Sequence, residues 1–241
     1  MAVIVFASSK GGVGKTTAAL TLASVIAHHD TEVVMLDCDP NGPLRQWATE
    51  WPELVPKGLH VLAPSPKDLP NAIDSAAGRV PLVIVDLEGT KGIEVNVGMG
   101  RADLALVPMQ SSQLDANQAA NVVSLIQHQA EVFKRPIPYR VFFSRTSAAI
   151  HTRTERALEA ELLSAGLPAM KSRLIEREAF RLPFRIGGTI YNLDRRDIKN
   201  PKPAIADAEG FAGEIQDILE EIMNLGPGEQ ELREGQGANH G

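Results

Sequence analysis

Short apolar runs alternate along the chain with longer stretches in which apolar residues recur every three to four positions. The first run, Ala2–Ala7, predicts a buried strand, and the stretch Thr16–His29 after it predicts a buried helix. Repeated strand–helix units of this kind indicate an α/β fold, with a largely parallel β-sheet flanked by helices on both faces. Further strands are expected at Glu32–Leu36, His60–Leu62, Leu82–Val85, Leu104–Val107 and Tyr139–Phe143.

The helical spacing also predicts the helices between these strands, and Asp115 is expected to be the N-cap of one of them. We expect residues 1–225 to form one domain. Residues 226–241 have almost no apolar side chains, so they are expected to form a disordered acidic tail. The further helices are expected at Gly42–Glu50, Leu69–Ala77, Asp115–Ala130, Arg153–Ala165 and Gly210–Asn224.

The composition is that of an ordinary globular protein, with 44% hydrophobic and 22% charged residues. The single cysteine, Cys38, excludes an intramolecular disulfide and any metal site that needs several thiolates from one chain. The longest apolar-rich stretch, residues 17–27, is shorter than the roughly 20 residues that cross a bilayer. We therefore expect a cytoplasmic protein that does not enter a membrane.

The strongest chemical signal is the segment KGGVGKTT, residues 10–17, which lies between a predicted strand and a predicted helix. Glycines let successive backbone N–H groups turn toward phosphate oxygens, and the helix N-terminus adds a favourable dipole. In such a loop Lys15 reaches the β- and γ-phosphates and Thr16 can bind Mg²⁺. The nucleotide-binding residues are expected to be Gly11, Gly12, Val13, Gly14, Lys15, Thr16 and Thr17.

This segment resembles the deviant Walker A motif of the ParA/MinD superfamily of P-loop ATPases. It departs from the strict G-x-x-x-x-G-K-[ST] pattern because Ser9 stands at the position of the first glycine, and it carries an additional lysine, Lys10. The resemblance implies ATP and Mg²⁺ as cofactors and a slow basal hydrolysis. It also implies that Lys10 crosses the interface of an ATP-sandwich dimer and touches the partner's nucleotide.

A first acidic segment, DCDPN at residues 37–41, resembles the D-x-D-P-Q segment of the superfamily, with Asn41 in place of glutamine. Carboxylates two positions apart after a strand point to the same side, so Asp37 and Asp39 can both face the phosphates. The resemblance implies that Asp39 positions the attacking water and that Asp37 supports the Mg²⁺ shell. The catalytic residues expected in this way are Lys10, Lys15 and Asp39.

A second acidic segment, LVIVD at residues 82–86, is typical of a Walker B strand, in which Asp86 holds Mg²⁺ together with Thr16. After Asp86 the superfamily often has a Ser or Thr followed by prolines, whereas this chain has Leu-Glu-Gly-Thr, so Glu88 has no role by resemblance. The strand near Phe143 often ends in an asparagine that contacts adenine, and this chain has Ser-Arg-Thr at residues 144–146 instead.

Three branches of the superfamily do different work, and the sequence separates them. A nitrogenase-reductase-like electron carrier needs cluster-binding cysteines, which the lone Cys38 cannot supply. A MinD-like membrane positioner ends in a basic amphipathic helix, whereas the expected final helix, residues 209–223, has five acidic and no basic side chains. The small ParF-type partition ATPases and a related accessory ATPase of T-DNA transfer are the most similar branch.

A basic stretch supports DNA binding by this branch, because residues 171–202 contain nine Lys and Arg and four Asp and Glu in a chain of net charge −6. Positive side chains can neutralise DNA phosphates without reading the base sequence. A solvated surface with nearby counter-charges is the alternative interpretation of the same stretch. The candidate DNA-binding residues are Lys171, Arg173, Arg177, Arg181, Arg185, Arg195 and Arg196.

These features predict a ParA-like, Mg²⁺-dependent ATPase that acts as an ATP-dependent homodimer and binds double-stranded DNA nonspecifically, so that it associates with the nucleoid. A ParB-like centromere-binding protein or an adaptor is expected to stimulate hydrolysis and so drive plasmid or chromosome partition. Two alternatives share the same cycle. One is an accessory ATPase that recruits DNA to a conjugative or T-DNA transfer channel, and the other positions a protein cargo along the nucleoid.

Overall fold

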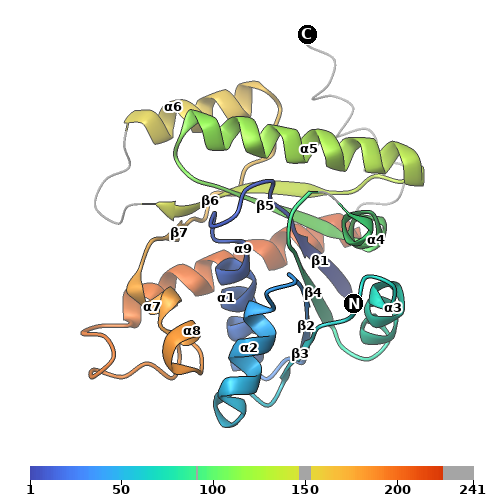
Figure 1. Cartoon of the computed structure of the whole chain (residues 1–241). Coiled ribbons are helices and arrows are strands. Elements are labelled where there is room, and N and C mark those ends of the chain that lie inside the picture. The colour runs from blue at the N-terminus through green and yellow to red at the C-terminus, as the bar shows by residue number, and fades with distance from the viewer. Residues whose placement is uncertain (91, 147–152, 225–241) are drawn as a thin grey trace.

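A seven-stranded parallel sheet runs through the computed structural model, which describes residues 1–90, 92–146 and 153–224 (Figure 1). The strand order is β3-β2-β4-β1-β5-β6-β7, and every strand pair is parallel. The predicted fold class is therefore confirmed. The strands are β1 (Ala2–Phe6), β2 (Val33–Cys38), β3 (Leu59–Leu62), β4 (Leu82–Leu87), β5 (Leu104–Met109), β6 (Tyr139–Thr146) and β7 (Leu174–Ile175).

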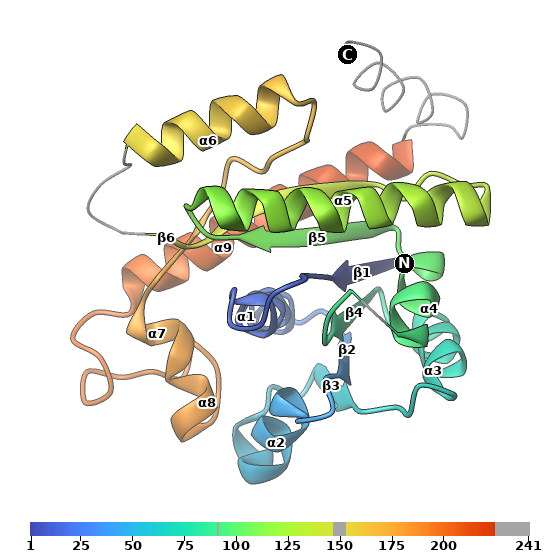
Figure 2. The same cartoon turned by 45° about the horizontal axis from the view of Figure 1, so that its top comes forward.

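Helices cover both faces of this sheet (Figure 2). On one face lie α1 (Lys15–His28), α2 (Pro43–Glu50), α7 (Glu178–Arg181), α8 (Pro183–Ile186) and α9 (Lys202–Asn224). On the other lie α3 (Leu69–Ala77), α4 (Ile93–Arg101), α5 (Gln113–Phe133) and α6 (Arg153–Ser164). A short 3₁₀ helix, η1 (Pro52–Leu54), follows α2. Within the described ranges, no helix combines the length and the apolar character that a membrane span needs.

Two hydrophobic cores form because successive side chains of each strand point to opposite faces of the sheet. In the central strand β1, Ile4 and Phe6 enter one core, and Val3 and Val5 enter the other. All four are buried, which explains why this strand is a continuous apolar run rather than an alternating one. The strand order places β1 in the middle of the sheet, so its carboxyl end and the loop after it lie there too.

The start of α5 differs from the prediction. Its N-cap is Ser112 and not Asp115, because the Ser112 Oγ accepts the backbone N–H of Asp115 at 3.1 Å. The Ser112 hydroxyl in turn donates to the Asp115 carboxylate at 2.5 Å. A serine followed three residues later by an acidic residue is a capping arrangement that competes with a single Asp cap. Asp115 therefore sits inside the first turn of the helix.

Several elements were not predicted because their local sequence disfavours them. The helix α4 contains Gly98 and Gly100, which lower helix propensity but allow close packing. A Cβ at Gly98 would lie 3.4 Å from Leu87, and one at Gly100 would lie 2.9 Å from the ring of Phe133. Helix α9 begins at Lys202, earlier than the expected Gly210, because Pro203 is tolerated in a first helical turn. The predicted tail, residues 226–241, lies outside the described residues.

The contact between β6 and α9 generates a first prediction, on stability. The rings of Phe142 and Phe211 lie 5.0 Å apart between centroids, and both side chains are fully buried. Phe211→Ala should lower the free energy of unfolding by about 3 to 5 kcal/mol, because it removes buried apolar area and leaves a cavity. Urea unfolding followed by circular dichroism measures this change. Met223→Ala, in the same helix at a side chain that is 60% exposed, is the control and should change little.

Candidate nucleotide-binding site

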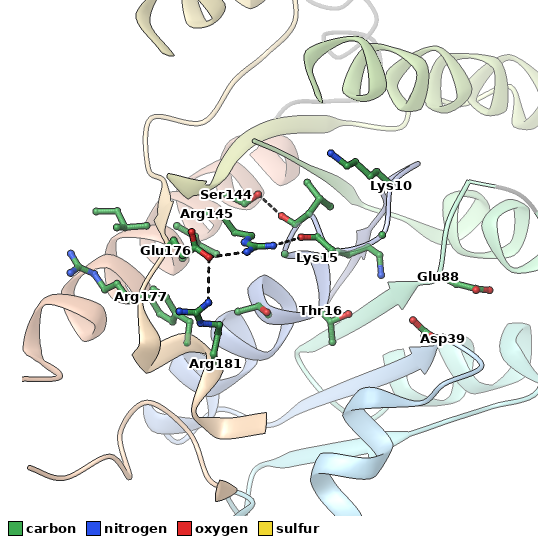
Figure 3. Close-up of a pocket in the computed structure, with 18 residues that line it drawn as sticks. Lys10, Lys15, Thr16, Asp39, Glu88, Ser144, Arg145, Glu176, Arg177 and Arg181 are labelled. Atoms are coloured by element: carbon green, nitrogen blue, oxygen red, sulfur yellow. Dashed lines mark hydrogen bonds and ion pairs between the residues drawn. The ribbon is translucent and has the colours of Figure 1, made fainter. Parts of the chain in front are cut away.

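A pocket of about 330 Å³ opens at the carboxyl ends of the central strands, where ligands of open α/β sheets bind (Figure 3). The loop between β1 and α1 forms its floor, the ends of β2 and β4 contribute one wall, and β6, β7 and α7 contribute the other. The lining residues are Lys10, Gly11, Gly12, Val13, Gly14, Lys15, Thr16, Thr17, Asp39, Glu88, Ser144, Arg145, Leu174, Ile175, Glu176, Arg177, Phe180 and Arg181.

The loop turns back on itself through two glycines with left-handed backbone conformations. Gly12 has a φ of 75° and Gly14 a φ of 98°, values that an L side chain rarely adopts. Gly14 is the N-cap of α1, so the free backbone N–H groups of the first helical turn face the pocket beside it. This is the backbone geometry that binds phosphate at a helix N-terminus.

The carboxylate of Asp86 holds the two residues that follow Gly14. Lys15 Nζ lies 2.7 Å from one carboxylate oxygen and the Thr16 hydroxyl donates to the other at 2.6 Å. Asp86 has no exposed surface, and the Lys15 side chain is only 8% exposed. Burial raises the pKa of the Asp86 carboxyl, whereas the charge and hydrogen bond of Lys15 and the hydrogen bond of Thr16 oppose this rise. The hydroxyl and the carboxylate are both hard oxygen donors, the kind that Mg²⁺ prefers.

Asp37, the last residue but one of β2, and Asp39, directly after this strand, have different surroundings. Asp37 is buried, and its oxygens accept the backbone N–H groups of Asp39 and Arg45 at 3.2 and 2.9 Å. Asp37 therefore shapes the turn into α2 and does not itself line the pocket. Asp39 does line it, and one of its oxygens accepts the backbone and side-chain N–H groups of Asn41 at 2.8 and 3.0 Å.

The two lysines of the loop point in different directions. Lys10 is 45% exposed and its ammonium lies 2.9 Å from Asp115 at the start of α5, whereas the Lys15 ammonium lies 2.7 Å from the buried Asp86. Figure 3 shows the two lysine side chains leaving the loop in different directions. Burial favours the neutral form of Asp115, but hydrogen bonds from Ser112 and Lys10 and the charge of Lys10 outweigh it and lower the pKa of this carboxyl.

The opposite wall holds residues that the sequence did not reveal. The Arg145 guanidinium donates to the Gly12 carbonyl at 2.7 Å and pairs with Glu176 at 2.8 Å, and its backbone adopts a φ of 54°. Ser144 donates to the carbonyl of Val13 at 2.6 Å. Hydrogen bonding to Arg145 lowers the pKa of Glu176. The end of β6, where the superfamily often has an asparagine, thus binds the loop backbone through Ser144 and Arg145.

The basic stretch 171–202 is divided between two environments. Most of its arginines pair with carboxylates: Arg173 with Glu155 and Glu159, Arg177 with Asp207, Arg181 with Glu176 and Glu178, Arg185 with Glu178, and Arg196 with Asp194. Arg177 and Arg181 also line the pocket, so they do not lie away from the nucleotide site.

The remaining cations of this stretch are exposed. Within the described residues, no ion pair involves Lys171, Arg195, Lys199 or Lys202. The last three line a surface hollow formed by the loop between α8 and α9. The sequence could not distinguish all of these cations from the paired ones, because three of the six pairing carboxylates, Glu155, Glu159 and Asp207, lie in α6 and α9.

Comparison with known proteins adds the family. The domain described as the CobQ/CobB/MinD/ParA nucleotide binding domain matches residues 4–219, which is most of the chain. The chain belongs to this family. Protein ParA of Rhizobium radiobacter is 35% identical over 224 residues, which cover 92% of this chain and 100% of that protein. Protein virC1 of Rhizobium rhizogenes is 27% identical over 188 residues, 75% of this chain and 79% of that protein.

Solved structures of this family share the fold. A plasmid partition protein from Borrelia burgdorferi, bound to AMPPNP, superimposes with a TM-score of 0.64 at 15% identity, covering 90% of this chain and 99% of that one. The ParA/MinD-family resemblance deduced from residues 10–17 is thereby confirmed. The protein is a P-loop ATPase of the ParA/MinD family, and its phosphate-binding loop is the floor of the pocket described above.

The contact between Lys10 and Asp115 generates a second prediction. Lys10→Met should raise the pKa of Asp115, because the variant lacks both the hydrogen bond and the positive charge. Carboxyl ¹³C NMR titration measures this pKa, and Lys134→Met is the control that leaves it unchanged. A carboxyl whose pKa is lower in the folded than in the unfolded protein stabilises the fold at pH values above its unfolded pKa. This stabilisation is lost as the pH falls through the folded pKa. Wild type should therefore lose more stability on acidification than Lys10→Met. An identical Asp115 pKa in both proteins would show that the pair does not form in solution.

Proposed function

We propose that this ATPase is a DNA-partition switch: it binds ATP with Mg²⁺, forms an ATP-sandwich homodimer, binds double-stranded DNA nonspecifically, and hydrolyses ATP slowly until a ParB-like centromere-binding protein or an adaptor stimulates it. The observation that carries this proposal is that two lysines of one loop have different partners: Lys15 is buried against Asp86, and the more exposed Lys10 pairs with Asp115 at the start of α5. The full-length similarity to a protein named ParA supports the same assignment.

Nucleotide and metal would share one arrangement. Backbone N–H groups of residues 11–17 and the Lys15 ammonium would bind the phosphates. Thr16 and Asp86 would hold Mg²⁺, whose charge stabilises the negative charge that develops on the phosphates. No group of three or more His, Cys, Asp or Glu in the described ranges is arranged to hold a metal ion. This fits a Mg²⁺ site that protein residues form only in part, because phosphate oxygens and water complete the coordination.

The dimer is supported by the surroundings of Lys10. Lys10 lines the pocket of its own chain, but its ammonium is bound by Asp115 at the start of α5 and its side chain is 45% exposed, so it is accessible to a nucleotide held by a second copy. Two apolar side chains, Ile93 and Leu114, are 60% and 62% exposed at the starts of α4 and α5. These helices begin after β4 and β5, at the same edge of the sheet as the phosphate-binding loop. A face with exposed apolar side chains around the pocket suits association of two copies across it.

DNA binding is best supported at the loop that precedes α9. Arg195, Lys199 and Lys202 are exposed there. A cation without a carboxylate partner can neutralise a DNA phosphate, and so release a counterion, without first losing an ion pair. Lys171 and the exposed arginines of the stretch, Arg181, Arg185 and Arg196, would add to this surface. Arg173 and Arg177 are less exposed and are paired with carboxylates.

A second candidate, an accessory ATPase of DNA transfer, is favoured by the similarity to virC1 over three quarters of the chain. The same nucleotide cycle and the same DNA surface serve either function. The genes beside this one separate the two: a small centromere-binding protein indicates partition, and transfer genes indicate recruitment of DNA to a secretion channel.

Asp39 and Lys10 should separate hydrolysis from assembly, which is a third prediction. Asp39→Ala should bind ATP and accumulate as a dimer, because the phosphate site remains while a water-positioning carboxylate is lost. Lys10→Ala should bind ATP and remain a monomer, because its contact is made only across the interface. Light scattering with ATP measures both. A monomeric Asp39→Ala protein together with a dimeric Lys10→Ala protein would contradict the two roles.

DNA affinity should depend on the exposed loop, which is a fourth prediction. The double variant Arg195→Glu, Lys199→Glu should bind DNA of any sequence more weakly than wild type does. Its slope of log affinity against log salt concentration should be flatter by roughly 2 per protomer. Mobility shifts with ATP at several salt concentrations measure this. Lys67→Glu with Arg79→Glu makes the same change of charge at the two ends of α3, on the other face of the sheet, and should bind as wild type does. Equal affinity of wild type and the loop variant, with ATP-dependent dimers intact, would exclude this loop as the DNA surface.

A further inference from the structure

Glu88 belongs to an arrangement of carboxylates that neither the motif nor the resemblance explains. The strands β2 and β4 are parallel neighbours, with Asp37 opposite Asp86 and Cys38 opposite Leu87. Asp39 is the first residue after β2 and Glu88 is the first residue after β4. Both Asp39 and Glu88 line the nucleotide pocket.

The carboxylates of Asp37 and Asp86 already have hydrogen-bond partners. Asp86 accepts from Lys15 and Thr16, and both oxygens of Asp37 accept backbone N–H groups. The carboxylates of Asp39 and Glu88 have fewer partners and can accept further hydrogen bonds. Asp39 uses one oxygen for Asn41, and Glu88 is exposed and makes no hydrogen bond with the described residues. Figure 3 shows Asp39 and Glu88 beyond Lys15 and Thr16, on the side of the pocket away from Arg145 and Glu176.

Two carboxylates at this place match the needs of an attacking water. A water molecule has two protons, and a hydrogen bond from each fixes the direction of its lone pair. Asp39 alone has one oxygen free of Asn41 and can accept one of these hydrogen bonds. We propose, on the basis of the function proposed above, that Glu88 accepts the second one and orients the water toward the terminal phosphorus of ATP.

The reaction that this water carries out balances without further reactants. The water oxygen forms a bond to the terminal phosphorus, and the bond from that phosphorus to the bridging oxygen breaks. The bridging oxygen keeps the electron pair and leaves as part of ADP. One water proton stays on the new phosphate hydroxyl. The other leaves its hydrogen bond to a carboxylate once the new bond has formed and moves to a second phosphate oxygen. Glu88 only orients the water and keeps its own charge throughout.

Glu88→Gln and Glu88→Asp test this role. Glu88→Gln should slow single-turnover hydrolysis by about tenfold or more at saturating ATP, because an amide presents a donor as well as an acceptor to the water. Its affinity for a fluorescent ATP analogue should match or exceed that of wild type, because a negative charge near the triphosphate is lost. Dimers formed with ATP should persist longer in light scattering. Glu88→Asp should recover part of the rate.

Glu94→Gln is the matched control. Glu94 lies in the first turn of α4, outside the pocket lining. It is still close to the site, because the pKa of Cys38, beside Asp39, is raised first by burial and then by the charges of Asp86, Asp37 and Glu94. It should hydrolyse ATP as wild type does. A hydrolysis rate of Glu88→Gln within twofold of the wild-type rate would overturn the role of Glu88. The same conclusion would follow if this variant lost ATP affinity and hydrolysis rate in parallel. A wild-type chain that binds ATP but never hydrolyses it would overturn the proposed function itself, and this inference with it.

Discussion

The ion pair between Asp86 and Lys15 is the interaction on which the rest of the site depends. A carboxylate with no exposed surface is costly in a protein interior unless cationic and hydrogen-bonding partners reach it. Those partners, Lys15 and Thr16, are the first two residues of α1, so the burial of Asp86 in β4 is tied to the place where α1 begins. The left-handed glycines Gly12 and Gly14 allow the chain to turn back far enough to meet it. The loop is thus held in shape by β4, and arriving phosphates would compete with Asp86 for Lys15.

The two walls of the pocket differ in charge, and each is tied to a different part of the fold. The wall of β2 and β4 carries carboxylates, whereas the wall of β6, β7 and α7 carries arginines that are partly neutralised by Glu176. Arg145 joins the second wall to the Gly12 carbonyl. The stretch 171–202 first lines this wall and then forms the exposed cationic loop, so one continuous segment connects the nucleotide site with the proposed DNA surface.

Most of the fold and the floor of the site could be predicted, because both depend on local sequence. Buried strands are apolar runs, and the loop is a short motif whose glycines and lysines act within a few residues of one another. What the sequence did not reveal depends on tertiary contacts. Helix α4 was not predicted because it contains glycines, which its close packing against β4 and α5 explains. Arg145 is paired with Glu176, which lies far along the chain. In the same way, the sequence does not reveal that Arg177 is paired, because its partner Asp207 lies in α9.

The central claim is that Lys15 stands at the phosphate site while Lys10 serves a different contact from the same loop. Titration of Lys15→Ala and Lys10→Ala with a fluorescent ATP analogue in the presence of Mg²⁺ tests it most directly, with circular dichroism to verify that both variants fold. Lys15→Ala should show no measurable binding, because the β- and γ-phosphates lose their cation in a partly desolvated loop, and Lys10→Ala should bind as wild type does. Wild-type affinity in a folded Lys15→Ala protein would contradict the account.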